Sequence, residues 1–583
     1  MCGGRRGYQS LVSAAKYPLH AARWKTTFRY FPQRSASTSP ADSNSFKWCE
    51  SVAALIGNAS RRSVHAIQGC AAMCCRISKR RGSASTRAIA WTSFFVRVLG
   101  RSGFVATPLS FHEFREIVSL MISRAFALSL CLLLAAGRLP AADLAEQYHA
   151  TADKLIDAAL ADTEGYNRLT YLCYRIGNRL SGSPGLEKAI AWSVEQMKAA
   201  GLSNVRVIPA KVPHWVRGAE SARMVAPSER PLHMLGLGMS IGTPPGGITA
   251  DVVAVSTFEE LTKLGKEKVQ GKIVLYNEEY RGYGPTRVYR ATGAARAAAF
   301  GAVAALVRSA TPLAMQIPHT GEMNYDEAQP KIPAAAVSPE DAMMLASLAG
   351  SGVPVKVHLE MSAQTLPDAD SGDVIGEIPG REHPEEVVVM GGHIDSWDVG
   401  QGAQDDGASI MACLQAVALM KKLGLQPRRT IRVAFWVNEE NGGHGGIAYR
   451  DFIGDKIKHQ VAAIEMDGGA EAPRGFGAGV DASSMEMLRQ IARLLDRIGA
   501  GEITAGGGGS DIGPLMRDGV PGLGERTVGT HYFDWHHTEA DTLDKVSPED
   551  FRKNVAALAV MGYALADMPG RLVATPVASR RGQ

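Results

Sequence analysis

The sequence predicts an α/β protein with a doubly wound, mostly parallel sheet that is interrupted by a smaller inserted β/α domain. Residues 363–583 contain strand, helix, strand, helix and strand patterns in that order, which is typical of doubly wound sheets. Acidic and histidine side chains follow these strands, at the edge where such sheets bind ligands. Residues 245–362 form a separate group of short apolar strands that lacks such side chains.

The chain has 583 residues and a formal net charge of +5, but the charge is unevenly distributed. Residues 1–142 hold 20 Lys and Arg against 4 Asp and Glu, which leaves 43 basic and 54 acidic residues in 143–583, a net charge of −11. The composition, 45% hydrophobic and 21% charged, excludes a disordered, collagen-like or multi-span membrane protein. Because the basic excess is confined to the first part, we expect no nucleic-acid partner.

Residues 121–142 have the pattern of a secretory signal peptide. Arg124 precedes an apolar run of 13 residues, Ala125 to Gly137, which is too short to span a bilayer comfortably. Two alanines then offer a cleavage site before Asp143. The alternatives are a buried core helix or an uncleaved anchor. We expect a secreted or periplasmic protein whose mature form has no membrane span.

Residues 1–120 precede that segment, are rich in Arg and Ser, and show no sustained helical or strand period. We interpret them as a non-native, disordered extension that results from a start codon assigned too early. The alternatives are a transit-like segment or a basic arm that binds nucleic acid. A cluster at Cys70, Cys74 and Cys75 lacks the second ligand pair that a metal site requires.

The catalytic domain is expected to comprise residues 143–244 and 363–583. The expected helices are Gln147–Ala161, Leu186–Ala200 and Ala408–Leu423, and the expected strands are Val205–Val212, Val387–Met390, Thr430–Val437 and Val461–Ile464. The strand Thr430–Val437 is apolar throughout, as expected for a parallel strand that is covered on both faces.

Residues 245–362 are expected to form the insert. Its expected strands are Asp251–Ser256, Lys272–Tyr276, Ala302–Val307, Ala334–Val337 and Val353–Leu359, with an Ala-rich helix at Ala291–Phe300 and a helix start at Ser338. Because no ligand or acid/base cluster appears in this part, we interpret it as a lid or a protein-interaction domain.

Chemically active side chains follow each strand of the catalytic part. They are His393 and Asp395 after the first strand, Asp405 and Asp406 in the next loop, Glu439 and Glu440 after the second strand, Asp467 after the third, and His536, His537 and Asp541 near the C-terminus. Each residue alone could be a surface charge or a helix cap. Together they would converge on one crevice, where like charges repel strongly unless cations neutralise them.

Two histidines and four carboxylates suit a pair of zinc ions, which bind imidazole nitrogen and carboxylate oxygen. One of these four carboxylates is then left over and can act as a general base. The HExxH helix of the single-zinc proteases does not occur in the sequence.

Four motifs in this part, GGHIDSWDVGQGAQDDGAS, FWVNEENGGHGG, IEMDGG and HHTEADT, resemble those of the co-catalytic zinc exopeptidases. The likeness covers roughly residues 145–570, and the middle unit resembles that family's protease-associated insert. The first motif is most similar to the carboxypeptidase Q-like branch. The resemblance implies a zinc-exopeptidase fold and a metallo-exopeptidase that hydrolyses dipeptides or short peptides. An aminopeptidase with the same site is the alternative, and the family's dimers imply a homodimer.

The resemblance also implies a role for each matching residue. His393 and Asp467 would bind one zinc ion, Glu440 and His537 would bind the other, and Asp405 would bridge the two.

Other residues would support this set. Glu439 matches the general base, and Asp395 matches the carboxylate that orients His393. Asp406 either belongs to the site or caps the following helix, His536 is expected to be a neighbour of the site, and Asp541 is expected to support His537. The expected roles of Asp406, His536 and Asp541 concern the surroundings of the metal ions.

The loop Gly506–Gly513, GGGGSDIG, departs from the aminopeptidase pattern. Gly508 stands where those enzymes have a Tyr that helps to hold the oxyanion, and Ile512 stands where they have a His. This difference favours the carboxypeptidase branch. The residue that would bind a substrate's terminal carboxylate is left open among Arg474, Arg517 and Arg526, and His444 is interpreted as a loop residue near a helix start.

Overall fold

The computed structural model describes residues 143–575. The extension expected at residues 1–120 and the signal peptide expected at 121–142 lie outside the described residues. None of the helices in 143–575 combines the length and the apolar character that a bilayer crossing requires.

The catalytic sheet has eight strands in the order β1-β10-β12-β11-β13-β16-β14-β15. Its centre is parallel, from β12 through β11 and β13 to β16, whereas β1, β10 and β14 are antiparallel to neighbours. The bounds are β1 Ser203–Val216, β10 Gln364–Ile378, β11 His383–His393, β12 Arg429–Trp436, β13 Gln460–Glu465, β14 Pro473–Ala478, β15 Glu502–Ala505 and β16 Gly522–Thr527.

Helices cover both faces of this sheet. The larger core packs against α5, α6, α7, α11, α13 and α16, and the smaller core packs against α12 and α14. Alternate side chains of one strand enter the two cores: Phe435 lies in the larger core and Trp436 in the smaller. The helices are α5 Leu144–Leu160, α6 Glu164–Tyr171, α7 Pro184–Ala199, α11 Ala408–Lys422, α12 His444–Ile453, α13 Ala482–Ala492, α14 Gly513–Arg517, α15 Tyr532–Trp535 and α16 Pro548–Asp567. Burial on both faces explains the continuous apolar run of β12.

Serine caps and following prolines define several helix starts. The Ser183 side chain accepts a hydrogen bond from the Leu186 backbone N–H at the start of α7, and Ser547 does the same for Asp550 at the start of α16. In each case proline occupies the first turn, where its missing N–H costs nothing.

The insert contains a second eight-stranded sheet, in the order β3-β2-β9-β5-β6-β7-β8-β4. Its strands are β2 Glu220–Ala226, β3 Arg230–Leu232, β4 Met234–Gly236, β5 Ile248–Val255, β6 Ile273–Tyr276, β7 Ala304–Arg308, β8 Ala334–Val337 and β9 Lys356–Met361, and its helices are α8 Phe258–Val269, α9 Tyr283–Ala299 and α10 Pro339–Gly350. The strands β2, β3 and β4 precede residue 245, so the sheet begins earlier than the expected insert boundary.

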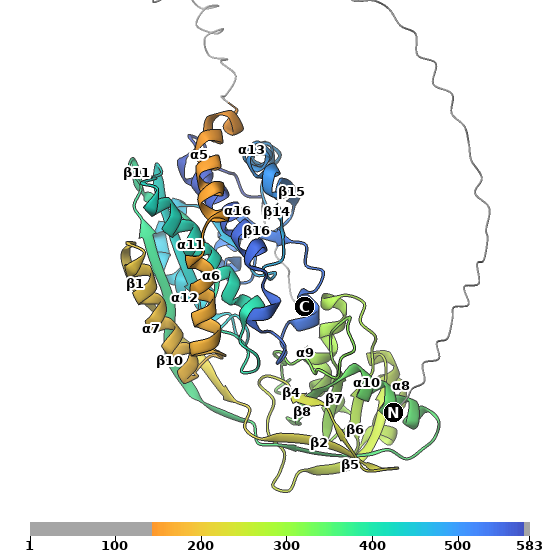
Figure 1. The fold of residues 1–583 in the computed structure, drawn as a ribbon. Helices are drawn as coiled ribbons and strands as arrows, with labels where there is room; N and C mark the ends of the chain where they lie inside the picture. The colour runs from red at the N-terminus through yellow and green to blue at the C-terminus, as the bar shows by residue number, and fades with distance from the viewer. Residues whose placement is uncertain (1–142, 576–583) are drawn as a thin grey trace, which may run out of the picture. The chain divides into compact units, whose positions relative to one another are not determined.

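The insert is continuous with the two long strands β1 and β10, which pair antiparallel from Ser203↔Glu377 to Val216↔Gln364 (Figure 1). The chain enters the insert after β1 and returns through β10. The sequence reasoning missed β10, and it placed the start of the insert helix at Ala291, whereas α9 starts at Tyr283. That extra helical segment contributes to the site described next.

Candidate metal centre

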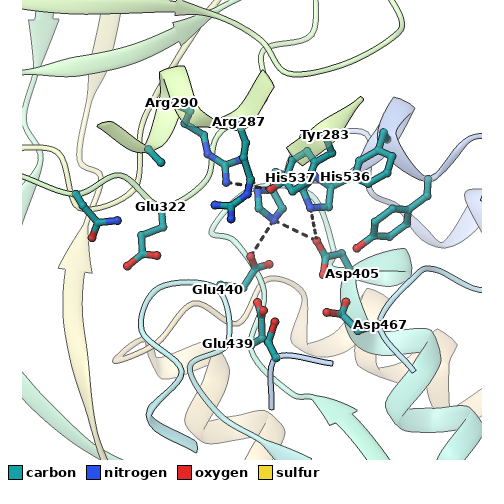
Figure 2. Close-up of a pocket in the computed structure, with 15 residues that line it drawn as sticks. Tyr283, Arg287, Arg290, Glu322, Asp405, Glu439, Glu440, Asp467, His536 and His537 are labelled. Atoms are coloured by element: carbon teal, nitrogen blue, oxygen red, sulfur yellow. Dashed lines mark hydrogen bonds and ion pairs between the residues drawn. The ribbon is translucent and has the colours of Figure 1, made fainter. Parts of the chain in front are cut away.

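The parallel pairing of β11, β12 and β13 brings their carboxyl ends to one edge. His393 pairs with Trp436 in register, and Gly391 pairs with Glu465. The residues that directly follow these strands, Glu439, Glu440 and Asp467, therefore lie near His393. The expected convergence of strand-end side chains is what the structure shows (Figure 2).

His393 belongs to a first cluster, in which its side chain is fully buried. Its Nε2 atom lies 3.1 Å from Asp405 Oδ1 and 3.6 Å from Asp467 Oδ1. His537 belongs to a second cluster, where its Nε2 lies 2.9 Å from Glu440 Oε2 and 3.3 Å from Asp405 Oδ2. Asp405 thus directs one carboxylate oxygen to each cluster.

His536 is adjacent to His537 in the sequence, and its side chain also lies at this centre. Its Nε2 is 3.5 Å from Asp405 Oδ2, and its ring stacks on that of His537 with the centroids 3.5 Å apart. The stacked pair presents two imidazoles to the same carboxylate oxygen.

Asp395 supports the turn after β12. Its carboxylate accepts hydrogen bonds from the backbone N–H groups of Glu439 (3.2 Å) and Glu440 (3.3 Å). The Nδ1 atom of His393 is closer to the backbone carbonyl oxygen of Asp395, at 3.0 Å, than to its carboxylate, at 3.7 Å. Asp395 therefore positions both the histidine and the glutamate pair.

Asp541 and Asp406 both accept hydrogen bonds from the backbone of the site. Asp541 accepts from the backbone N–H groups of Ala403, Gln404 and Asp405, so it supports the loop that carries Asp405 and not His537. Asp406 accepts the backbone N–H of His393 at 3.0 Å, while the residue before α11 is Gly407. Both aspartates hold the backbone that carries the candidate ligands.

Arg179 supports the loop between β11 and α11. Its buried guanidinium donates to the carbonyl oxygens of Gly177, Ile394, Gln401 and Gly402. Since this loop carries Asp395 and Asp405 at its two ends, the arginine fixes their separation.

The electrostatics of the centre favour a bound positive charge. Burial raises the pKa of Glu440 and Asp467, and the charge on Asp405 raises both further. Burial also lowers the pKa of His393, but its hydrogen bonds to Asp395, Asp405 and Asp467 outweigh this effect and raise the pKa overall. Each carboxylate is therefore stabilised when a cation lies beside it.

Three carboxylate oxygens of the candidate metal-binding groups are buried without a hydrogen-bond donor among the described residues. They are Asp405 Oδ2, Asp406 Oδ1 and Glu440 Oε1. Candidate metal-binding groups form around both clusters, with ligand atoms within 4.8 Å of one another. Unpaired buried oxygens beside imidazole nitrogens are the donor set of a divalent cation such as zinc.

Glu439 lies beside these ligands and is half-buried. Burial, with the nearby charges of Asp467 and Glu440, raises its pKa to about 8, although His393 opposes the shift. A carboxylate in this position can take up and release a proton near neutral pH.

The clusters open into a cavity of about 420 Å³. The cavity is lined by Asp405, Glu439, Glu440, Asp467, Ser510, Tyr532, Phe533, His536 and His537 of the catalytic part and by Tyr283, Arg287, Arg290, Ala291, Glu322 and Asn324 of the insert (Figure 2). The insert therefore lines the site, as a lid would, although none of its residues was predicted as a site residue from the sequence. The signal available for this was the spacing of Tyr283, Arg287 and Arg290 at i, i+4 and i+7.

The insert also contacts the second cluster directly. The backbone N–H of Thr320 donates to the carbonyl oxygen of His537 at 3.0 Å, and the Thr320 carbonyl oxygen lies 3.2 Å from His537 Nδ1. With Nδ1–H donating to this carbonyl, Nε2 is left free to bind a metal.

The glycine-rich loop owes its composition to close packing. A Cβ atom on Gly508 would lie 2.4 Å from Met516 Sδ, and one on Gly509 would lie 1.9 Å from Glu465 Oε1. Ile512 is buried in the smaller core. The three arginines Arg474, Arg517 and Arg526 are absent from the cavity lining.

Comparison with known proteins identifies the family. The model for peptidase family M28 matches residues 373–561, and the PA domain model matches residues 248–345. Carboxypeptidase Q of Mus musculus is 41% identical over 403 residues, which cover 69% of this chain and 86% of that protein. The chain belongs to peptidase family M28. Carboxypeptidase Q of Homo sapiens is 40% identical over 408 residues, covering 70% of this chain and 86% of that protein.

A crystal structure of an M28 peptidase precursor from Shewanella amazonensis has the same fold. It aligns with a TM-score of 0.72 and 32% sequence identity, over 74% of this chain and all of that one. These findings confirm the predicted α/β fold with an inserted protease-associated domain and the prediction of a metallo-exopeptidase.

In this M28 chain, Asp395→Asn should lower peptidase activity by about 10- to 100-fold, because the amide replaces one of the carboxylate oxygens that accept from the Glu439–Glu440 backbone. Steady-state kinetics, with circular dichroism to verify folding, measures the effect. Asp368→Asn, on an exposed part of β10, is the matched control. Equal activity of the two variants would contradict the supporting role of Asp395.

Proposed function

We propose that the protein is a secreted or periplasmic, zinc-dependent exopeptidase that hydrolyses dipeptides or short peptides with carboxypeptidase Q-like specificity. The observation that carries this proposal is the position of Asp405, whose two carboxylate oxygens face two separate histidine–carboxylate clusters. Export depends on the signal peptide expected at residues 121–142. A homodimer is expected from the family alone.

The proposal includes two zinc ions per chain. His393 and Asp467 would hold one ion, Glu440 and His537 would hold the other, and Asp405 would bridge them. When bound, such a pair supplies a Lewis acid that polarises the scissile carbonyl and lowers the pKa of the attacking water.

Glu439 acts as the general base in this mechanism. Its carboxylate removes a proton from the attacking water, holds it in a half-buried position, and then donates it to the nitrogen of the leaving amine. Ser510 contributes a hydrogen bond that stabilises the ionised carboxylate before the proton arrives. Asp395 holds the backbone of Glu439 in place throughout.

The alternative is an aminopeptidase that uses the same centre. The carboxypeptidase names of the relatives with about 40% identity support the first reading, and so do Gly508 and Ile512 in the loop where aminopeptidases of this group carry Tyr and His. An aminopeptidase would instead need a group at the cavity that selects a free amino terminus.

Dipeptides that are blocked at one end should distinguish the two activities. We expect N-acetylated dipeptides to be cleaved and C-amidated dipeptides to be poor substrates for the zinc-loaded protein, with product release followed by chromatography. The opposite order of reactivity would support the aminopeptidase.

Replacement of the base should separate metal binding from turnover. We expect Glu439→Gln to retain its zinc and to lose about 10²- to 10⁴-fold in kcat, because the amide cannot accept the proton. Elemental analysis and steady-state kinetics give the two measurements, with Glu486→Gln on the exposed surface of α13 as the control. Near-normal kcat with bound zinc would show that another group is the base.

Replacement of Asp405 should remove the zinc ions from both clusters. Asp405→Ala removes the one carboxylate that both clusters share, so zinc content should fall from two ions per chain to none and activity should disappear. Asp368→Ala should keep both ions. Two zinc ions per chain in the Asp405→Ala protein would refute the bridge.

A further inference from the structure

An ion pair between Arg217 and Asp398 joins the insert to the loop that carries Asp405. Arg217 lies between β1 and β2, where the chain enters the insert, and Asp398 lies in the loop between β11 and α11. The arginine donates from Nε to Asp398 Oδ2 at 2.8 Å and from Nη2 to Asp398 Oδ1 at 2.6 Å. Two parallel charge-assisted hydrogen bonds fix both the separation and the orientation of these segments.

The same guanidinium group also binds the backbone of the insert. Arg217 is 8% exposed, and its Nη1 donates to the carbonyl oxygen of Gly236 at the end of β4. Its Nη2 also donates to the hydroxyl of Thr320 at 3.4 Å, and that hydroxyl donates to the same Gly236 carbonyl at 2.7 Å. Glu220 completes the network, because its Oε1 lies 3.5 Å from Arg217 Nη1 and accepts the Gly236 N–H at 3.0 Å.

Thr320 connects this network to the second cluster. Its backbone N–H donates to the carbonyl oxygen of His537, and its own carbonyl oxygen lies 3.2 Å from His537 Nδ1. Arg217 therefore contacts the loop of one candidate ligand, Asp405, and the residue that orients another, His537. Since Asp405 Oδ2 and His537 Nε2 are 3.3 Å apart, a shift of the insert against the loop would change the geometry of this cluster.

An apolar contact lies at the same junction. Trp397, directly before Asp398, is 2% exposed, and its ring centroid is 5.6 Å from that of His537. Gly238 of the insert packs so closely on this ring that a Cβ atom there would lie 1.9 Å from Trp397 Cη2. Because apolar packing is non-directional, the orientation of the insert depends on the ion pair of Arg217.

We propose that Arg217, through its pair with Asp398, is a positioning residue for the second zinc ion, which Glu440 and His537 would hold. This inference rests on the zinc pair of the proposed function. The ion pair orients the insert, and the insert orients the ring of His537 for metal binding. By reciprocity, a bound ion stabilises the contact of the insert with the catalytic part.

The first zinc ion should depend less on Arg217. His393 and Asp467, which would hold it, come from the ends of β11 and β13 in the centre of the catalytic sheet. The inference thus predicts an unequal effect of one substitution on two neighbouring ions.

Zinc titration of the metal-free proteins against a chromophoric chelator tests this prediction. We expect Arg217→Ala to weaken the binding of one of the two ions by about 10- to 100-fold, as is typical for the loss of a group that supports a metal ligand, and to leave the other unchanged. Unchanged affinity for both ions, or an equal loss for both, would overturn the assignment.

Asp398→Asn gives a second measurement in case Arg217→Ala does not fold. The side chain of Asp398 is 24% exposed, and the amide keeps its shape while it removes the charge and one of the two acceptors. This variant should weaken the same ion, and wild-type affinities in it would contradict the role of the pair.

A His537→Ala background assigns the effect to one site. In a protein without that imidazole, the further substitution Arg217→Ala should not change the affinity of the remaining ion, because the two residues act through one another. An additional loss in the double variant would show that Arg217 does not act through His537.

Arg223→Ala is the matched control. Arg223 is exposed on β2 of the same insert, its Nε lies 3.5 Å from Glu229 Oε1, and it is outside the cavity lining. This variant should bind both ions as the wild-type protein does. A loss of one ion in the control would overturn the assignment to Arg217.

Hydrogen exchange keeps this inference separate from the proposed function. In the metal-free protein, Arg217→Ala should make the Thr320 N–H exchange at least about 10-fold faster, because the insert loses a charged hydrogen-bonded pair. Mass spectrometry of peptides that contain Thr320 measures this without turnover. Faster exchange with one weakened ion supports the assignment even if no peptide is hydrolysed, whereas unchanged exchange refutes it even if the peptidase is active.

Discussion

Mutual repulsion among buried carboxylates is the constraint on which this site depends. The parallel centre of the sheet delivers Glu440 and Asp467 to one edge, and the loop after β11 adds Asp395, Asp405 and Asp406. Each of these groups loses hydration on burial, and each raises the energy of the others when ionised. A fold that concentrates them must supply compensating positive charge or hydrogen-bond donors at short range.

The chain supplies that compensation to different carboxylates in different ways. Asp395 and Asp541 accept hydrogen bonds from backbone N–H groups, so their charge is balanced by the loops that they hold together. Asp405 and Glu440 instead keep a buried oxygen without a donor, beside imidazole nitrogens. An unpaired buried oxygen costs free energy that a bound cation would recover.

The insert is part of this electrostatic arrangement. His537 has a positive φ of 63°, which is an unusual backbone conformation for a residue other than glycine, and Thr320 meets both its carbonyl oxygen and its ring. The conformation of a candidate ligand is thus held by the backbone of another domain. The insert therefore contributes to the site itself, since its Thr320 carbonyl oxygen lies 3.2 Å from the His537 ring nitrogen.

Different parts of this organisation were accessible to sequence reasoning for different reasons. The apolar strands and the acids that follow them are local patterns, and they predicted the sheet centre and the convergence of His393, Asp405, Glu440 and Asp467. By contrast, the contact of Asp541 with Asp405 joins residues 136 positions apart, and it depends on backbone donors that no side-chain pattern reveals.

The start of α9 was missed because the prediction rested on the Ala-rich segment Ala291–Phe300, whereas the helix begins at Tyr283, just before a glycine and a proline. Proline is compatible with the first turn of a helix, since the N–H groups there have no intrahelical partner. Extending the helix back to Tyr283 is what aligns Arg287 and Arg290 on one face. The acidic residues of the site are therefore predictable from local sequence at the strand ends. Arg287 and Arg290 reach the cavity only because the fold places a helix of the insert beside it. Since the substrate would lie in the cavity that both parts of the chain line, the insert's sequence should determine what the acidic centre can cleave.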